Sequence, residues 1–418
     1  MARLHLLRAA RIAALGIAAA SLVACGGSPT KPDDNGNLGT GGTGGAQQTD
    51  LPDEPPAAPK VAKEAKPLFE EAVKAYTAGN GAKAISLFEE AIDVDESFGA
   101  AYFNIGRIHE EQGRIDEART WYERSAEKGK AFGDGLVNIG RLEMEKGNKG
   151  EAMALFRRAI QIEPFNGEAH LNLAQDARSR RAFADAVKHV RTALKEDSQN
   201  VLAYEVLARV YYDLGRFELS KLVCLTGLEI KKTADLYNTL GLVHLKQNNV
   251  TTALGSFEDA LKVDTNYWPA HMNVGAITFS YRDYESSYRH FSEVLKQKPE
   301  HLEAMLSKAV AARGLERLDE AESGYKAVIA KDETYAAAHY NLGILYQEYT
   351  QKLEDAIKSY ESVLRHERQD AALRKDVSQR IEAVRIQIKN MKELEEMMRQ
   401  QKAQEAAQGG GGDGGGDG

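Results

Sequence analysis

A short pattern that returns at a fixed interval constrains this chain more than any other feature. An Asn, an aliphatic residue and a small residue stand together at 104–106, 138–140 and 172–174, each 34 residues after the last. The pattern returns at 273–275 and 341–343. A period of this length predicts one structural unit repeated many times. Such a unit cannot bury its own apolar face and must stack on its neighbours.

A second series predicts that each unit holds two helices. Ala84, Phe88 and Ala91 are spaced by 4 and 3 residues, which places them on one helical face. The same spacing recurs at 152, 156 and 159 and at 253, 257 and 260. A Gly-containing turn separates the two series in several units, for example at Gly113-Arg114. The predicted unit is therefore a helix-turn-helix.

This unit closely resembles the tetratricopeptide repeat (TPR), a 34-residue helix-turn-helix with small residues where the two helices cross. The resemblance implies an all-α fold: a right-handed TPR superhelix, or α-solenoid, of about nine repeats over residues 65–368. The units begin near Ala65, Gly99, Gly133, Gly167, Val201, Ala234, Trp268, Leu302 and Ala336. Repeats 4, 5 and 8 depart from the pattern through Arg181 in a turn, Cys224 and Gly227 in core positions, and Lys308 in an apolar position.

The start of the chain predicts a membrane address. Three arginines precede the apolar stretch Ile12–Ser21, which is too short to span a bilayer. The following Leu22-Val23-Ala24-Cys25 resembles the lipobox of bacterial lipoproteins, which implies a signal peptide over residues 1–24 and lipid on Cys25. Gly26 in place of Asp favours the outer membrane, facing the periplasm, by resemblance to lipoprotein sorting signals. The alternative is an ordinary signal peptide with a chance Cys.

Residues 25–64 are rich in Gly and Pro and predict a flexible tether.

The charge and the motifs of the chain argue against several function classes. The formal net charge of −8 argues against phosphate-driven nucleic-acid binding. The chain lacks phosphate-loop, dinucleotide-binding, zinc-protease and hydrolase motifs, and the predicted repeats leave no room for a catalytic domain. We therefore expect no enzyme, no catalytic residues, no cofactor and no metal, and we expect the histidines to be packing or groove residues.

By resemblance, the first helix of each TPR lines a concave peptide-binding groove. The sixth position of the unit carries Asn104, Asn138, Asn172, Asn273 and Asn341. A carboxamide both donates and accepts hydrogen bonds, so spaced amides suit the backbone of an extended peptide. The alternative is that these amides only solvate the groove.

The ninth position predicts two chemically different zones. Its residues in order are Val73, Arg107, Arg141, Gln175, Arg209, Leu242, Ala276, Val310 and Ile344. The basic zone, with Arg178 beside it, suits an acidic or C-terminal peptide segment. The apolar zone, with Leu245 and Phe279, suits aliphatic anchors of a helix or strand. Alternatively, Asp134, Glu168 and Glu205 neutralise the arginines.

Residues 369–408 predict one long helix with apolar residues spaced by 3 and 4. It caps the last repeat, or it offers a partner or dimer contact through Ile381, Val384, Ile388 and Met391. Residues 409–418 are Gly and Asp only, which predicts a disordered tail.

Taken together, the sequence predicts a membrane-anchored TPR scaffold that binds envelope proteins and supports assembly of a cell-envelope machine. Its lipobox, tether and long array resemble the TPR lipoprotein of the myxobacterial gliding-motility machinery. Two alternatives remain open: a pilotin-like lipoprotein for type IV pilus secretin assembly, and an accessory module of a cell-wall or glycan enzyme.

Overall fold

The computed structural model describes residues 60–130 and 132–409 of the chain. These residues form nineteen α-helices and one π-helix and contain no strand. The chain divides into two compact units at Ser256, within α13 (Val250–Val263). The predicted signal peptide, Cys25 and most of the predicted tail lie outside the described residues.

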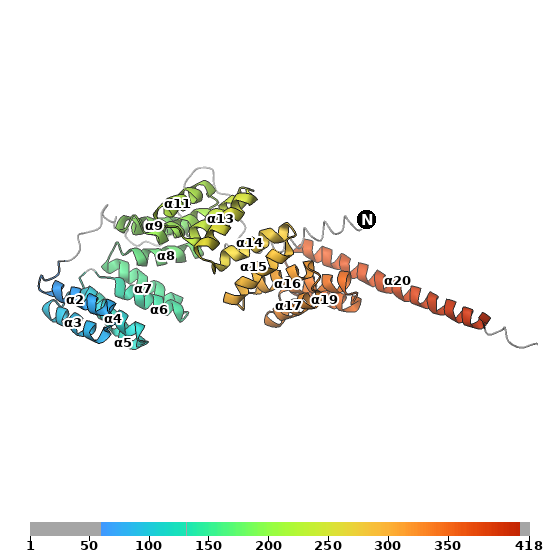
Figure 1. Ribbon diagram of the computed structural model, residues 1–418, viewed down its shortest axis with the longest axis horizontal. Helices are drawn as coiled ribbons and strands as arrows, with labels where there is room; N and C mark the ends of the chain where they lie inside the picture. The colour runs from blue at the N-terminus through green and yellow to red at the C-terminus, as the bar shows by residue number, and fades with distance from the viewer. Residues whose placement is uncertain (1–59, 131, 410–418) are drawn as a thin grey trace, which may run out of the picture. The chain divides into compact units, whose positions relative to one another are not determined.

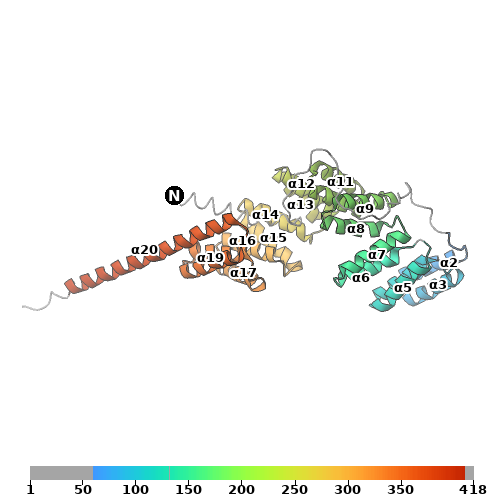
Figure 2. The same ribbon diagram turned by 180° about the vertical axis from the view of Figure 1, so that it is seen from behind.

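Both units consist of antiparallel helix pairs (Figure 1; Figure 2). The first unit contains α2 (Ala65–Thr77), α3 (Gly81–Val94), α4 (Gly99–Glu111), α5 (Ile115–Lys128), α6 (Asp134–Glu145), α7 (Lys149–Ile162), α8 (Gly167–Ser179), α9 (Phe183–Glu196), α10 (Val201–Asp213), α11 (Phe217–Ile230) and α12 (Ala234–Lys246). The second contains α14 (Trp268–Ser280), α15 (Tyr284–Gln297), α16 (Leu302–Gly314), α17 (Leu318–Lys331), α18 (Ala336–Ile344), the π-helix η1 (Leu345–Tyr349), α19 (Leu353–His366) and α20 (Ala371–Gly409). The predicted all-α repeat fold is confirmed, and each first helix begins at the expected residue or one residue later.

Small residues allow the paired helices to cross closely. A Cβ atom added at Gly140 in α6 would lie 2.5 Å from Cε1 of Phe156 in α7. The same contact forms between Gly106 and Tyr122, at 2.6 Å from Cδ1. Phe156 and Tyr122 are fully buried. The glycine therefore makes room for the ring that fills the space between helices, because protein interiors leave few voids.

The turn between the helices of each unit needs one residue with positive φ. Four units use glycine, for example Gly215 at φ 72°. Five use other residues: Arg181, Asn248, Arg282, Glu316 and Gln351, at φ between 55° and 63°. The left-handed region is unfavourable for residues with a Cβ, although Asn tolerates it, so the four turns that use Arg, Glu or Gln are strained.

The last repeat differs from the others by one residue. Its first helix starts 17 residues before its second, at Ala336 and Leu353, whereas Leu302 and Leu318 are 16 apart. The π-helix η1 follows α18 and accommodates the additional residue, which is how π-bulges arise inside α-helices. The 34-residue pattern did not predict this insertion.

Candidate binding surfaces

The predicted amides lie on the first helices, but several are already engaged. Nδ2 of Asn104 donates to the carbonyl of Ala100 at 2.7 Å, and Nδ2 of Asn172 donates to the carbonyl of Glu168 at 2.9 Å. Asn138 hydrogen-bonds to the Tyr122 side chain. These three are half-buried and belong to the first unit. Their partners within the fold reduce what they can offer to a peptide.

In the second unit the amides are more deeply placed. Asn273 and Asn341 are each 7% exposed. Nδ2 of Asn341 donates to the carbonyl of Ala337 at 2.8 Å, while its Oδ1 is buried without a hydrogen-bond partner. The sixth position therefore does not form a uniform row of accessible amides, and peptide binding through it remains a prediction.

Each predicted arginine pairs with an acid on its own helix or in a neighbouring repeat. Arg141 pairs with Glu110 and, at 2.7 Å, with Glu145. Arg209 pairs with Asp235 in the next repeat. The carboxylates compensate the cations, so this zone is not a strongly basic surface.

The remaining cations of the zone follow the same pattern. Arg178 pairs with Asp213 at 2.5 Å. The Arg107 guanidinium lies 3.7 Å from Glu111 and 5.5 Å from the centroid of the Tyr76 ring, a cation–π contact. The acids that neutralise the arginines are different from the three proposed from the sequence.

Glu110 connects three helices of the first unit. It accepts the Tyr122 hydroxyl from α5 at 2.6 Å and the Arg141 guanidinium from α6. Burial, followed by the hydrogen bond to Glu110, raises the pKa of Tyr122. The ion pair therefore holds neighbouring repeats together.

The predicted apolar zone needs a correction. Leu242 and Ala276 are half-buried, but Val310 and Ile344 are 2% and 3% exposed. Both belong to the main core cluster of the second unit, together with Tyr346. Val310 and Ile344 are core residues and do not offer an apolar surface to a ligand.

The predicted partner seam on α20 also needs a correction. Ile381 and Val384 are 6% and 0% exposed and belong to the same core cluster as Val310. Ile388 packs against this cluster, whereas Met391 is 43% exposed. The first part of α20 therefore caps the array, and of the four predicted contact residues Met391 alone is exposed.

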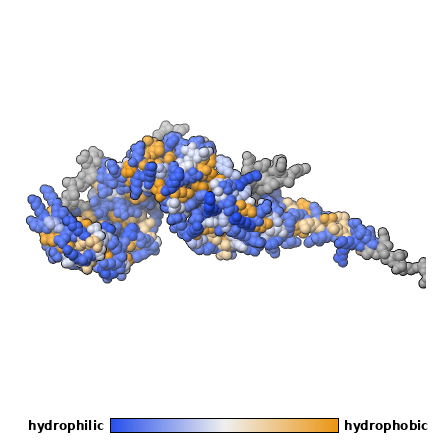
Figure 3. Space-filling view, viewed as in Figure 1, coloured by the Kyte–Doolittle hydropathy of each residue, from blue (hydrophilic) through white to orange (hydrophobic). Residues whose placement is uncertain are grey.

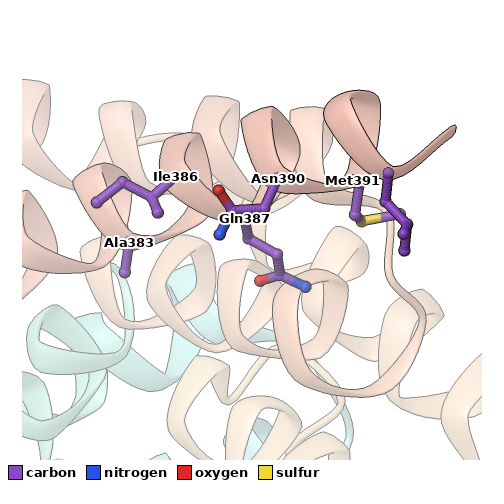
Figure 4. Close-up of a pocket in the computed structure, with 6 residues that line it drawn as sticks. Ala383, Ile386, Gln387, Asn390 and Met391 are labelled. Atoms are coloured by element: carbon purple, nitrogen blue, oxygen red, sulfur yellow. The ribbon is translucent and has the colours of Figure 1, made fainter. Parts of the chain in front are cut away.

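The cap is fastened by polar contacts as well as by its apolar face. The Tyr340 hydroxyl donates to Asp376 at 2.9 Å, and Arg380 lies 3.0 Å from Glu348. Gln387 donates to Gln351 at 2.9 Å. Figure 4 shows Gln387 among residues that follow one another along α20. These contacts seat α20 against the last repeat.

An apolar stripe on α11 was missed in the sequence. Leu219, Leu222 and Leu225 are 39%, 61% and 43% exposed. Figure 3 shows hydrophobic residues gathered at the surface around α11. The signal was present in the repeat alignment, because the equivalent residues of α9 are Asp185, Lys188 and Arg191 and those of the other second helices are mostly polar. An exposed apolar patch of this kind is typical of an interaction site.

Two pairs of histidines have the same geometry. The Nδ1 atoms of His170 and His189 are 2.8 Å apart, as are those of His271 and His290.

Within the described ranges, no group of three or more His, Cys, Asp or Glu could hold a metal ion. Among these same residues no helix has the length and apolarity needed to cross a bilayer. The only cysteine in the described part, Cys224, is buried, and burial raises the pKa of its thiol to about 12.

Comparisons with known proteins identify the class of repeat. One tetratricopeptide-repeat family matches residues 69–135 and 171–220, and a second matches residues 134–166. Residues 269–378 match the TT21 fifth ARM repeats domain. The chain therefore contains tetratricopeptide repeats, and proteins of this class bind protein partners.

Three individual proteins resemble this chain over different shares of its length. Human tetratricopeptide repeat protein 6 is 26% identical over 149 residues, which is 36% of this chain and 29% of that protein. A monomeric mutant of IFIT1 with Gppp-AAAA has a TM-score of 0.51 and 16% identity, over 80% of this chain and 85% of that one. PilF of Pseudomonas aeruginosa has a TM-score of 0.43 and 20% identity, over 53% and 97%. At 16% identity, the likeness to IFIT1 shows the fold alone.

Proposed function

We propose that this protein is a non-catalytic scaffold, held at the outer membrane by lipid on Cys25, that gathers protein partners in the periplasm. The observation that carries the proposal is the array of tetratricopeptide repeats, since this class works by binding proteins. The apolar stripe on α11 adds a surface for a partner. The lipobox and the Gly-rich stretch after it support attachment to a membrane.

The cell-envelope machine we propose is the gliding-motility apparatus. The support is the layout of the sequence: lipobox, Gly-rich tether, long TPR array and extended final helix. A scaffold of this kind would hold several subunits at once, because a solenoid presents a long surface relative to its mass.

The anchor is tested by labelling cells with a clickable palmitate analogue and separating their membranes. We expect wild-type protein to carry label and to fractionate with the outer membrane. A Cys25→Ala variant should lose the label and leave that fraction. Unlabelled wild-type protein in the soluble fraction would remove the anchor from the proposal.

The scaffold role is tested by in-cell crosslinking combined with a motility assay. Deletion of the gene should abolish gliding, and crosslinked partners should include other components of the apparatus. Leu222→Lys should reduce crosslinking to those components, whereas Leu202→Lys, at a 47% exposed leucine on α10, is the matched control. Normal gliding after deletion would exclude this machine.

A further inference from the structure

The outer part of α20 has an apolar stripe that no other element of the described residues covers. Every residue from Lys389 to Glu405 is exposed, and Met391, Leu394 and Met398 are 43%, 54% and 51% exposed. Figure 3 shows hydrophobic residues along this extended part of α20. A stable amphipathic helix normally buries such a stripe against another element.

The stripe has the spacing of a coiled-coil seam. Met391, Leu394 and Met398 are separated by 3 and 4 residues, and Gln401 continues the same pattern. This alternation places the four residues at successive a and d positions of a heptad. The cap uses an earlier part of α20, through residues 377, 381 and 384, so the exposed seam from Met391 onward is free for another helix.

The charges around the stripe do not select a strongly acidic or basic partner. Residues 391–405 carry three basic and four acidic side chains. Polar contacts link neighbours on the same helix: Lys389 lies 3.7 Å from Glu393, and Gln401 donates to Glu405 at 3.0 Å. A nearly neutral helix with an apolar seam fits best a helix with the same pattern.

We infer that the occupant is a second copy of this chain, paired through α20 as a parallel, in-register coiled coil. Leu394 then meets Leu394 of the other copy at a d position, which favours two strands. Asn390 at a g position faces Glu395 of the other copy at an e position, so that the amide donates to the carboxylate. An antiparallel pair centred on this part of the seam instead brings Glu395 beside Glu395, a like-charge contact.

The second copy also accounts for the remaining apolar residue of this segment. Met397, 59% exposed, occupies a g position and faces Lys402 of the other copy at e. The aliphatic part of a lysine side chain packs on apolar surface while its ammonium stays in water. The parallel pair therefore contains no opposed like charges at e and g.

Sedimentation of the mature chain, kept in solution by Cys25→Ser, tests this inference. We expect the average mass to rise from monomer towards dimer between about 1 and 100 µM, as mass action requires. Leu394→Glu with Met398→Glu should remain monomeric throughout. Gln400→Glu with Ala403→Glu adds the same charge outside the seam, so this control should dimerise like the parent.

Circular dichroism of each variant verifies that it is folded, and a cysteine tests orientation. With Cys224→Ala, Met398→Cys should form a disulfide between the two copies on oxidation, since a parallel pair places the two positions together. A parent that stays monomeric at 100 µM, or a Leu394→Glu, Met398→Glu variant that still dimerises, overturns the inference. A dimer without the disulfide overturns the parallel orientation. None of these results depends on the lipid anchor.

Discussion

At the residue scale, backbone strain in the turns is the clearest departure of this chain from an ideal repeat. Arg181 has φ 61° in the turn between α8 and α9, and its side chain is exposed. A left-handed conformation costs an L-residue about 1–2 kcal/mol, which glycine avoids. Replacing Arg181 with Gly should therefore raise the free energy of unfolding by about 1 kcal/mol.

Urea denaturation measures this effect as a higher midpoint. Gly215, with φ 72° in the equivalent turn of the next repeat, is the control, because Gly215→Ala should lower the midpoint. A lower midpoint for Arg181→Gly would mean that the arginine side chain contributes more than its backbone costs.

The two histidine pairs are a second feature set by individual residues. Nε2 of His170 faces the carbonyl of Pro164 at 2.9 Å and must carry a proton, since a carbonyl only accepts. Nδ1 of neutral His170 is then an acceptor, so Nδ1 of His189 donates to it. Nε2 of His271 similarly faces the carbonyl of Thr265 at 3.0 Å. Each pair is therefore complete when both rings are neutral.

Acid should weaken both pairs. Burial, followed by the charge of the facing ring, lowers the pKa of His189 and of His290 to about 4. Lys188 and Arg157 lower the pKa of His189 further, and Asp185 opposes them. The folded state binds these protons more weakly than the unfolded state does. Stability should thus decline from about pH 6.5 towards pH 4, by up to about 3 kcal/mol per pair.

Thermal melts across this pH range test the prediction. His189→Asn with His290→Asn keeps a donor near each Nδ1 but removes the titration, so its melting temperature should depend less on pH. His366→Asn is the control, because His366 stacks on His339 and belongs to neither pair. An equal pH dependence in parent and double variant would exclude the pairs as the cause.

The ion pairs between individual side chains were the feature that the sequence predicted least well. The sequence placed Arg141 and Arg209 correctly on first helices, but their partners Glu110 and Asp235 lie 31 and 26 residues away along the chain. Several acids lie within a similar sequence distance, and only the stacking of repeats decides which one is reached. The ion pairs therefore favour the alternative that acids neutralise the arginines, through other acids than the three proposed.

At the scale of elements, the residue at the crossing point controls how closely the two helices of a repeat pack. Gly140→Ala should lower the free energy of unfolding by about 1–3 kcal/mol, because its new Cβ would overlap the Phe156 ring. Gly255 in α13 is the control: a Cβ there meets nothing within 4 Å, so Gly255→Ala should stabilise by about 0.5–1 kcal/mol. Chemical denaturation of both variants measures the contrast. Equal shifts of the same sign would contradict the crossing geometry.

The starts of the helices were predictable, because they recur with the repeat period. Departures from the period were not predictable. The regular spacing located Leu302 and Ala336 at the starts of α16 and α18. It gave no signal for η1, where one additional residue is absorbed. Nor could it divide the apolar seam of α20, because both the capping face and the exposed stripe have intervals of 3 and 4.

At the scale of the whole molecule, stability in a repeat array comes from interfaces between neighbours. The period predicted one continuous run of repeats, and the structure divides it within α13. Periodicity reports the similarity of successive units but not how strongly each interface is packed. The cap is informative in this respect, because α20 closes the core of the second unit with Val377, Ile381 and Val384.

Hydrogen exchange of two truncated chains should separate the roles of α20. A chain ending at Arg368 loses three buried side chains, each contributing about 1.5–3 kcal/mol, so amides of α18 and α19 should exchange much faster. Protection in α2 to α11 should be unchanged, because interfaces act locally. A chain ending at Asn390 keeps the cap and should match the full chain in α18 and α19. Equal protection in both truncated chains would contradict a capping role for the first part of α20.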